Sequence, residues 1–181
     1  TIYAKNYKSN SGKKIKSNKI LYYGTFYRDF EKDVLVKNEA INDLKKILAL
    51  EEDLICDIKL HPLDKNRIYL EQLIKNNSLN ATIILLSNDF SLAENTENYR
   101  IIISDFSTET IFASLISQNI FFVKTSLNEK HFKSLNDFLE KKRIGDNDYY
   151  SIDRTKLERF QSEYFQPFNV DLFEKAVQKY N

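Results

Sequence analysis

The stretch RIIISDFSTETIFASLISQNIFFV, residues 100–123, decides the fold of this 181-residue chain. It indicates a strand over 100–104, a polar turn, a helix over 107–117 and a second strand over 119–123. The central parts of both strands, III at 101–103 and IFFV at 120–123, are apolar and do not alternate in polarity, which is typical of strands buried on both faces. Two such strands joined by a helix predict a parallel pair within a helix-covered sheet.

The same alternation of strand and helix extends along the rest of the chain. Short apolar runs predict three more strands, over 20–23, 54–60 and 81–86. Apolar residues at helical spacing predict further helices over 38–50, 65–76, 91–95 and 131–142. Asn38 is the expected cap of the first helix. We therefore expect a Rossmann-like α/β fold, a doubly wound parallel sheet of about five strands with helices on both faces.

The two ends of the chain differ from this pattern. Residues 1–18 are rich in Lys, Ser and Asn, which indicates a linker or solvated tail, or else a polybasic contact with a membrane surface or phosphate. Residues 19–145 form the expected nucleotide-sugar-binding domain. Residues 146–181 are expected to form an aromatic helical tail that packs on this domain or on a missing one. Because the sequence begins at Thr1 and holds no Met, we interpret it as a fragment or processed chain.

The composition excludes several classes of protein. Lys and Arg (27) balance Asp and Glu (26), so no concentrated basic face for nucleic acid is expected. The only cysteine is Cys56, which rules out a disulfide framework and fits the cytoplasm. No apolar run is long enough to span a bilayer, so any membrane contact is expected to be peripheral, at the inner face. No cluster of metal-ligating residues is visible, and we expect no metal cofactor.

Polar residues follow each of the first four predicted strands. They are Gly24 and Thr25, His61 and Pro62, Ser87 to Asp89, and the turn over 104–108. The carboxyl ends of parallel strands share one edge of a sheet, and ligands bind outside that edge. We therefore expect the binding site here, although the order of strands in the chain does not show which ends are neighbours.

The turn at 104–108 ends a strand and opens a helix. The free N–H groups and the positive dipole end of such a helix favour an anion. Ser104, Ser107 and Thr108 add hydroxyl groups where a phosphate would lie. The alternative is that these residues only cap the helix, because Ser, Thr and Asp are its preferred N-caps.

His61 stands at the tip of a predicted strand, directly before Pro62, which restricts its backbone. Its imidazole would donate a hydrogen bond to a phosphate oxygen or protonate a departing phosphate. The alternative is a surface histidine in a strand-to-helix loop. We assign no function to His131.

Together, KLHP at 59–62 and SDFSTET at 104–110 resemble motifs in the C-terminal domain of GT-B glycosyltransferases. The resemblance covers roughly 18–142 and is greatest to the bacterial sialyltransferase and polysialyltransferase group, with capsule-type CDP-glycerol phosphotransferases a near relation. In these families an HP motif and a Ser-Ser/Thr motif bind the nucleotide phosphate. The resemblance implies this role for His61, Pro62, Ser107 and Thr108, together with Ser104, and a catalytic role for His61.

The resemblance also implies the reaction. The donor is a nucleotide sugar, expected to be CMP-sialic acid, with CDP- or UDP-linked donors as alternatives. The acceptor is a bacterial surface glycan of lipopolysaccharide or capsule, and the general base lies in an N-terminal domain or partner chain. Candidate nucleoside contacts are Gly24, Thr25, Ser87, Asp89 and Glu109.

Of three other hypotheses, two remain open and the dinucleotide-binding one is nearly excluded. A receiver-like or flavodoxin-like module would need an acidic pair after its first strand, whereas Asp29 and Asp33 lie well down the loop. A dinucleotide-binding oxidoreductase would need G-x-G-x-x-G, and only Gly24 is present at that turn. A non-catalytic interaction module would use the basic N-terminus and aromatic tail to dock a partner.

Overall fold

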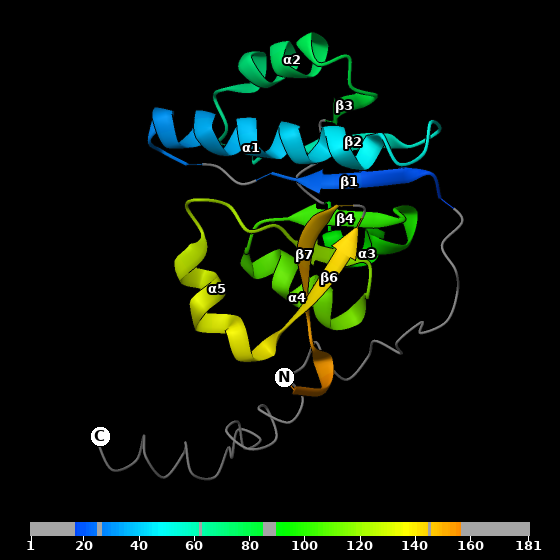
Figure 1. Cartoon of the computed structure of the whole chain (residues 1–181), viewed down its shortest axis with the longest axis vertical. Helices are drawn as coiled ribbons and strands as arrows, with labels where there is room; N and C mark the ends of the chain where they lie inside the picture. Colours follow the sequence, from blue (N-terminus) through cyan, green and yellow to red (C-terminus); the bar gives the residue numbers. More distant parts are fainter. Residues whose placement is uncertain (1–16, 25–26, 62, 85–89, 145, 157–181) are drawn as a thin grey trace, which may run out of the picture.

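The computed structural model describes residues 17–24, 27–61, 63–84, 90–144 and 146–156. The chain folds around a seven-stranded sheet of order β3-β2-β1-β4-β5-β7-β6 (Figure 1). Its strands are β1 (Lys19–Tyr23), β2 (Ile55–Lys59), β3 (Ala81–Ile84), β4 (Ile101–Ser104), β5 (Ile120–Phe122), β6 (Leu139–Ile144) and β7 (Asn147–Ile152).

The first five strands pair in parallel, in the order β3-β2-β1-β4-β5. Their apolar side chains point alternately into two cores, one on each face of the sheet. In the central strand β1, Ile20 belongs to one core and Leu21 to the other, and both are wholly buried. The predicted doubly wound α/β fold is therefore confirmed, and its strands are continuously apolar because helices cover both faces.

Helices α1 (Phe30–Leu48) and α2 (Arg67–Asn76) cover one face of the sheet, and Figure 1 shows them above β1. Helices α3 (Leu92–Asn95), α4 (Thr108–Ile116) and α5 (Glu129–Leu135) cover the other and lie below β1 in that view. Short 3-10 helices, Thr96–Asn98 and Asn136–Phe138, follow α3 and α5. Because the first five strands pair in parallel, their carboxyl ends all lie on one edge of the sheet.

Helix α1 begins at Phe30, well before the predicted start, so the assignment of Asn38 as its cap is wrong. The cap is Asp29, whose carboxylate accepts a hydrogen bond from Lys32 N at 3.0 Å. Asn38 lies within the helix and donates through Nδ2 to Val34 O and to Tyr69 Oη, each at 2.9 Å. Asn38 therefore connects α1 to α2 from within the helix and does not cap its start.

The last two strands differ from the prediction. A helix was expected over 131–142 and helical structure after 146, but α5 ends at Leu135, and β6 and β7 form an antiparallel hairpin that joins β5. Burial favours a strand over 147–152, because pairing of β7 with β5 places Tyr149 wholly inside the core that α1 and α2 cover. Most of the predicted linker (1–16) and tail (157–181) lies outside the described residues.

Among the residues that the structure describes, no helix has the length and apolar character to cross a membrane.

Candidate functional site

The order in which the chain adds strands to the sheet reverses between β1 and β4. From β1 the chain moves through α1 to β2 and β3 on one side, and it then returns to β4 on the other. Ligands of open α/β sheets bind outside the carboxyl ends of the strands at such a switch point. Gly24 follows β1 here and Ser104 ends β4, so two of the predicted polar clusters flank the switch point directly.

Gly24 brings the loop after β1 close to the end of β2. Its N–H donates to Lys59 O at 2.8 Å, and a Cβ at this position would lie 3.2 Å from the same oxygen. A side chain would therefore crowd the backbone of β2, which accounts for a glycine here. Thr25, the other predicted contact in this loop, lies outside the described residues.

The first turn of α4 follows the switch point. Ser107 is its N-cap: Ser107 Oγ accepts from Thr110 N at 3.1 Å, and Ser107 N donates to Thr110 Oγ1 at 3.0 Å. This reciprocal pair is a capping box, which fixes the direction of the helix. Thr108 is the first residue of α4. The hydroxyl of Ser104 is buried and donates to Asp105 O at 2.6 Å, so it lies behind the surface of the edge.

The carboxylate of Glu109, also in the first turn of α4, is held by two donors. Its Oε1 accepts from Leu92 N at 3.0 Å, and its Oε2 accepts from the Tyr23 hydroxyl at the end of β1. Burial and the bond to Glu109 raise the pKa of Tyr23, so this hydroxyl keeps its proton. Glu109 is thus fixed beside the switch point and connects α4, β1 and the start of α3.

His61 begins a tight turn after β2. Asp64 N donates to His61 O at 2.9 Å and closes the turn, and Leu63 N donates to His61 Nδ1 at 3.1 Å. A nitrogen that accepts cannot carry the proton of a neutral imidazole, so Nε2 is the N–H donor of the ring. The His61 side chain is exposed at the edge. Pro62 and the third-strand candidates Ser87 and Asp89 lie outside the described residues.

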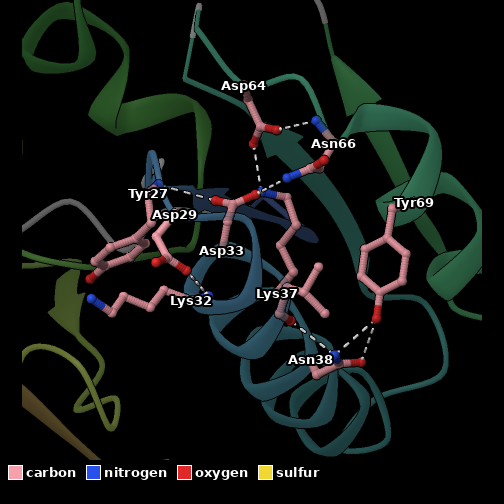
Figure 2. Close-up of polar contacts among 10 residues, drawn as sticks. Tyr27, Asp29, Lys32, Asp33, Lys37, Asn38, Asp64, Asn66 and Tyr69 are labelled. Atoms are coloured by element: carbon pink, nitrogen blue, oxygen red, sulfur yellow. Dashed lines mark hydrogen bonds and ion pairs between the residues drawn. The ribbon is translucent and has the colours of Figure 1, made fainter.

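A buried ionic cluster fastens this turn to α1 (Figure 2). The ammonium of Lys37 lies 2.6 Å from Asp33 Oδ2 and 2.7 Å from Asp64 Oδ2. Asn66 donates to both carboxylates, through Nδ2 to Asp33 at 2.5 Å and through its backbone N to Asp64 at 2.8 Å. Since the side chains of Asp33, Lys37 and Asp64 are nearly inaccessible, the cluster holds the His61 turn at a fixed place against α1.

A second buried carboxylate joins three loops of the same edge. Asp105 Oδ1 accepts from Asn128 Nδ2 at 2.6 Å and from Phe106 N at 2.7 Å, and Asp105 Oδ2 accepts from the Tyr27 hydroxyl at 3.0 Å. Tyr27 in turn donates its N–H to Asp33 at 3.1 Å, in the ionic cluster. The loops after β1, β4 and β5 are therefore held in one hydrogen-bonded framework.

Lys59, the last residue of β2, contributes a cation that lies against Tyr23. Its Nζ lies 2.6 Å from the Tyr23 hydroxyl and 4.0 Å from the centre of the ring. Burial lowers the pKa of Lys59, and the nearby Glu109 carboxylate partly offsets this effect. Tyr23 therefore stands between a cation of β2 and a carboxylate of α4.

The structure places Gly24, His61, Ser104, Ser107, Thr108 and Glu109 along one edge of the sheet, at the ends of three adjacent strands. Sequence reasoning missed the residues that hold this edge together: Tyr23, Asp33, Lys37, Lys59, Asp64 and Asn128. The one available signal was Asp33 and Lys37, which are spaced four apart in a helix and so lie on the same side of it. In the described part of the chain no group of three His, Cys, Asp or Glu side chains is arranged to hold a metal ion.

Neither a family model nor a curated protein matches the sequence of this chain. The geometry of the edge is therefore the basis on which its function is inferred.

Proposed function

We propose that the carboxyl edge binds the phosphate of a nucleotide sugar, and that the chain is the donor-binding domain of a glycosyltransferase. The supporting observation is that the His61 turn and the N-terminal turn of α4 lie on the same edge, on either side of the end of β1. The favoured donor is CMP-sialic acid and the acceptor a bacterial surface glycan. We place the reaction in the cytoplasm, with peripheral contact at the inner face of the membrane.

In this proposal the acceptor hydroxyl attacks the anomeric carbon, and the bond between that carbon and the phosphate oxygen breaks. The bonding electrons leave with the nucleotide, whose phosphate gains negative charge in the transition state. Preorganised N–H and O–H donors stabilise such charge most effectively because they need not reorient during the reaction. His61 supplies one donor through Nε2–H, and the N–H groups in the first turn of α4 supply others.

The positions of the hydroxyl protons in the capping box determine whether Ser107 can donate a hydrogen bond to the phosphate. Thr110 Oγ1 lies 3.1 Å from Asp105 O and 2.9 Å from Ser107 Oγ. When Thr110 donates to Asp105 O, the proton of Ser107 is directed either to Thr110 Oγ1 or to a ligand. Ser107 can therefore cap α4 through its lone pair and donate to a phosphate through its O–H. Capping and phosphate binding are thus compatible at this residue.

The acceptor proton needs a base from outside this edge. Asp105 and Glu109 are the carboxylates nearest the first turn of α4, and hydrogen-bond donors hold both in place. A carboxylate fixed in this way serves to order the loops. We therefore assign the general base to an N-terminal domain or a partner chain.

Isothermal titration of the chain with CMP, CDP, UMP and UDP tests the proposal. We expect selective binding of a cytidine nucleotide, weakened about tenfold or more by His61→Ala through loss of one hydrogen bond to a charged group. His131→Ala is the matched control, because α5 covers the sheet near β5, three strands from β2. A uridine preference would retain the transferase proposal and change the donor to a UDP-linked sugar.

A non-catalytic interaction module is the second candidate. The observation that favours it is that Ser104, Ser107 and Glu109 all have hydrogen-bond partners within the protein. If no nucleotide binds, these contacts are purely structural and this candidate takes the place of the transferase.

A further inference from the structure

Lys59 differs from the other cation buried at this edge. Lys37 lies between two carboxylates, each within 2.7 Å of its ammonium. Among the residues that the structure describes, no carboxylate lies within ion-pair distance of Lys59 Nζ, although the side chain is partly buried. Its nearest countercharge is the Glu109 carboxylate, which it meets only through the Tyr23 hydroxyl. A partly buried cation without a direct ion pair is incompletely compensated, and such a group at a ligand-binding edge favours an anionic ligand.

The Tyr23 hydroxyl accepts a hydrogen bond from only one of the three N–H groups of the Lys59 ammonium. The Tyr23 hydroxyl donates a hydrogen bond to Glu109, so its oxygen is left to accept one from Lys59 Nζ at 2.6 Å. An ammonium has three N–H donors, and Tyr23 Oη takes one of them. The Tyr23 ring also lies under the charge at 4.0 Å, which restricts where the ammonium can point.

The same contacts place the ammonium next to the switch point. Tyr23 is the last residue of β1, and the Glu109 carboxylate that it contacts belongs to the first turn of α4. The cation therefore lies close to the positive end of the α4 dipole, and both favour a bound anion, whereas the Glu109 carboxylate, already held by Tyr23 and Leu92 N, opposes one. A compact ammonium is a point charge suited to a phosphate group.

We propose that Lys59 is a phosphate ligand, whose ammonium binds the donor phosphate, and that Tyr23 is the positioning residue that holds it there. This inference rests on the proposed function and goes beyond it by assigning a residue outside the HP and Ser-Thr turns. Glu109 orients Tyr23, and through Tyr23 it fixes the ammonium. The nucleoside and the sugar are not bound by Lys59.

The test compares ligands with and without phosphate. Dissociation constants for CMP, cytidine and inorganic pyrophosphate are measured by calorimetry for the wild type, Lys59→Met, Lys59→Arg and Tyr23→Phe. We expect Lys59→Met to weaken CMP and pyrophosphate about 10- to 100-fold, as for a hydrogen bond to a charged group, and to leave cytidine unchanged. Lys59→Arg recovers part of the affinity, and Tyr23→Phe weakens CMP less than Lys59→Met does.

Lys19→Met is the matched control. It removes the same charge at the opposite, amino end of β1, where Lys19 pairs with Asp57 at 3.6 Å, and should change no dissociation constant. Circular dichroism confirms that each variant is folded. An equal loss for CMP and cytidine, or no loss for CMP, would overturn the assignment of Lys59 while leaving the transferase proposal intact.

If the wild type binds pyrophosphate but no nucleotide, the proposed transferase fails while Lys59 is still judged by the loss of pyrophosphate in Lys59→Met. If the wild type binds none of the three ligands, both proposals are wrong.

Discussion

Two lysines at one edge of the sheet illustrate how a buried cation is accommodated. Lys37 is compensated by Asp33 and Asp64 and joins α1 to the turn after β2. Lys59 is supported by a hydroxyl and a ring, which stabilise a cation less than two carboxylates do. The first is a structural residue, whereas the second keeps its charge available to a ligand. The same residue type thus has different roles, set by its neighbours.

Lys37→Met should destabilise the fold strongly. It leaves the carboxylates of Asp33 and Asp64 buried without their cation, and breaking such a pair costs about 3–5 kcal/mol. Urea denaturation measures the change in the free energy of unfolding. Adding Asp64→Asn to the variant should recover part of the loss, because one uncompensated charge is then removed. A loss below about 1 kcal/mol for Lys37→Met, the level of an exposed ion pair, would show that the cluster is not essential.

The partly buried Asp43 of α1 makes the stability of the fold depend on pH. Burial raises the pKa of this carboxyl above its ordinary 3.8, and Lys46 only partly offsets the effect. The folded state then holds its proton to a higher pH than the unfolded state, so this residue's contribution to stability falls as pH rises through that window. Asp43→Asn should therefore stabilise the protein at pH 7, with the gain shrinking below pH 4. Thermal unfolding at both pH values measures this, and a gain independent of pH would contradict it.

At the scale of elements, α4 combines two requirements in one turn. Ser107 caps the helix, and the same turn is where a phosphate would be bound. Helix α1 differs in its cap, which is the carboxylate of Asp29, although both helices carry acidic residues in the first turn. A carboxylate cap is acceptable where no anion binds. At α4 a neutral hydroxyl cap leaves the dipole available to a ligand.

Substitution of Ser107 separates capping from phosphate binding. Ser107→Ala removes the cap and should cost about 1 kcal/mol of stability. Ser107→Asp keeps the cap, so its stability should stay within about 0.5 kcal/mol of the wild type. Its carboxylate would repel a phosphate and should weaken CMP binding about tenfold or more. Chemical denaturation and calorimetry on the same samples check both effects, and unchanged CMP affinity in Ser107→Asp would remove the phosphate from this turn.

At the scale of the whole molecule, the hairpin of β6 and β7 completes the sheet. β7 pairs with β5 through Phe122 and Tyr150, and Phe132 of α5 contacts Tyr150 edge-on at 4.8 Å. Tyr149, on the opposite side of β7, is wholly buried in the core under α1. A segment late in the chain therefore stabilises both faces of the fold.

Tyr149→Ala should cost about 3–5 kcal/mol, the range for losing a large aromatic side chain from a core. Tyr149→Phe is the control for the ring, because within the described part of the chain the hydroxyl has one hydrogen-bond partner, Asn147 Nδ2 at 3.4 Å. Asp148→Ala, on an exposed position of the same strand, should change little. Thermal unfolding followed by circular dichroism measures all three variants. A loss below about 1 kcal/mol in Tyr149→Ala would mean that the hairpin is peripheral to folding.

The parallel part of the fold was predictable because its signal is local. Continuous apolar runs such as 101–103 fall on buried strands, and the connecting helices follow their apolar spacing. The hairpin was not predictable, because β6 (LEKKRI) carries consecutive charges and becomes a strand by pairing with β7. At the site, the turns of His61 and Ser107 were predictable because polar residues directly follow apolar strand sequences there. Lys59 was not, since its importance comes from Tyr23, a residue distant in sequence.

The charges on β6 also bear on how the molecule behaves in a crowded solution. β6 is the outermost strand on its side of the described sheet, and its unpaired backbone would accept a strand from another chain. Lys141, Lys142 and Arg143 lie along it, and Lys141 forms an ion pair with Asp148 at 2.6 Å. Lys142 pairs with Glu140 at 2.7 Å, and Arg143 with Asp146 at 3.7 Å. Charged side chains on an edge strand disfavour pairing with a second copy, because their ion pairs and hydration would have to be disrupted.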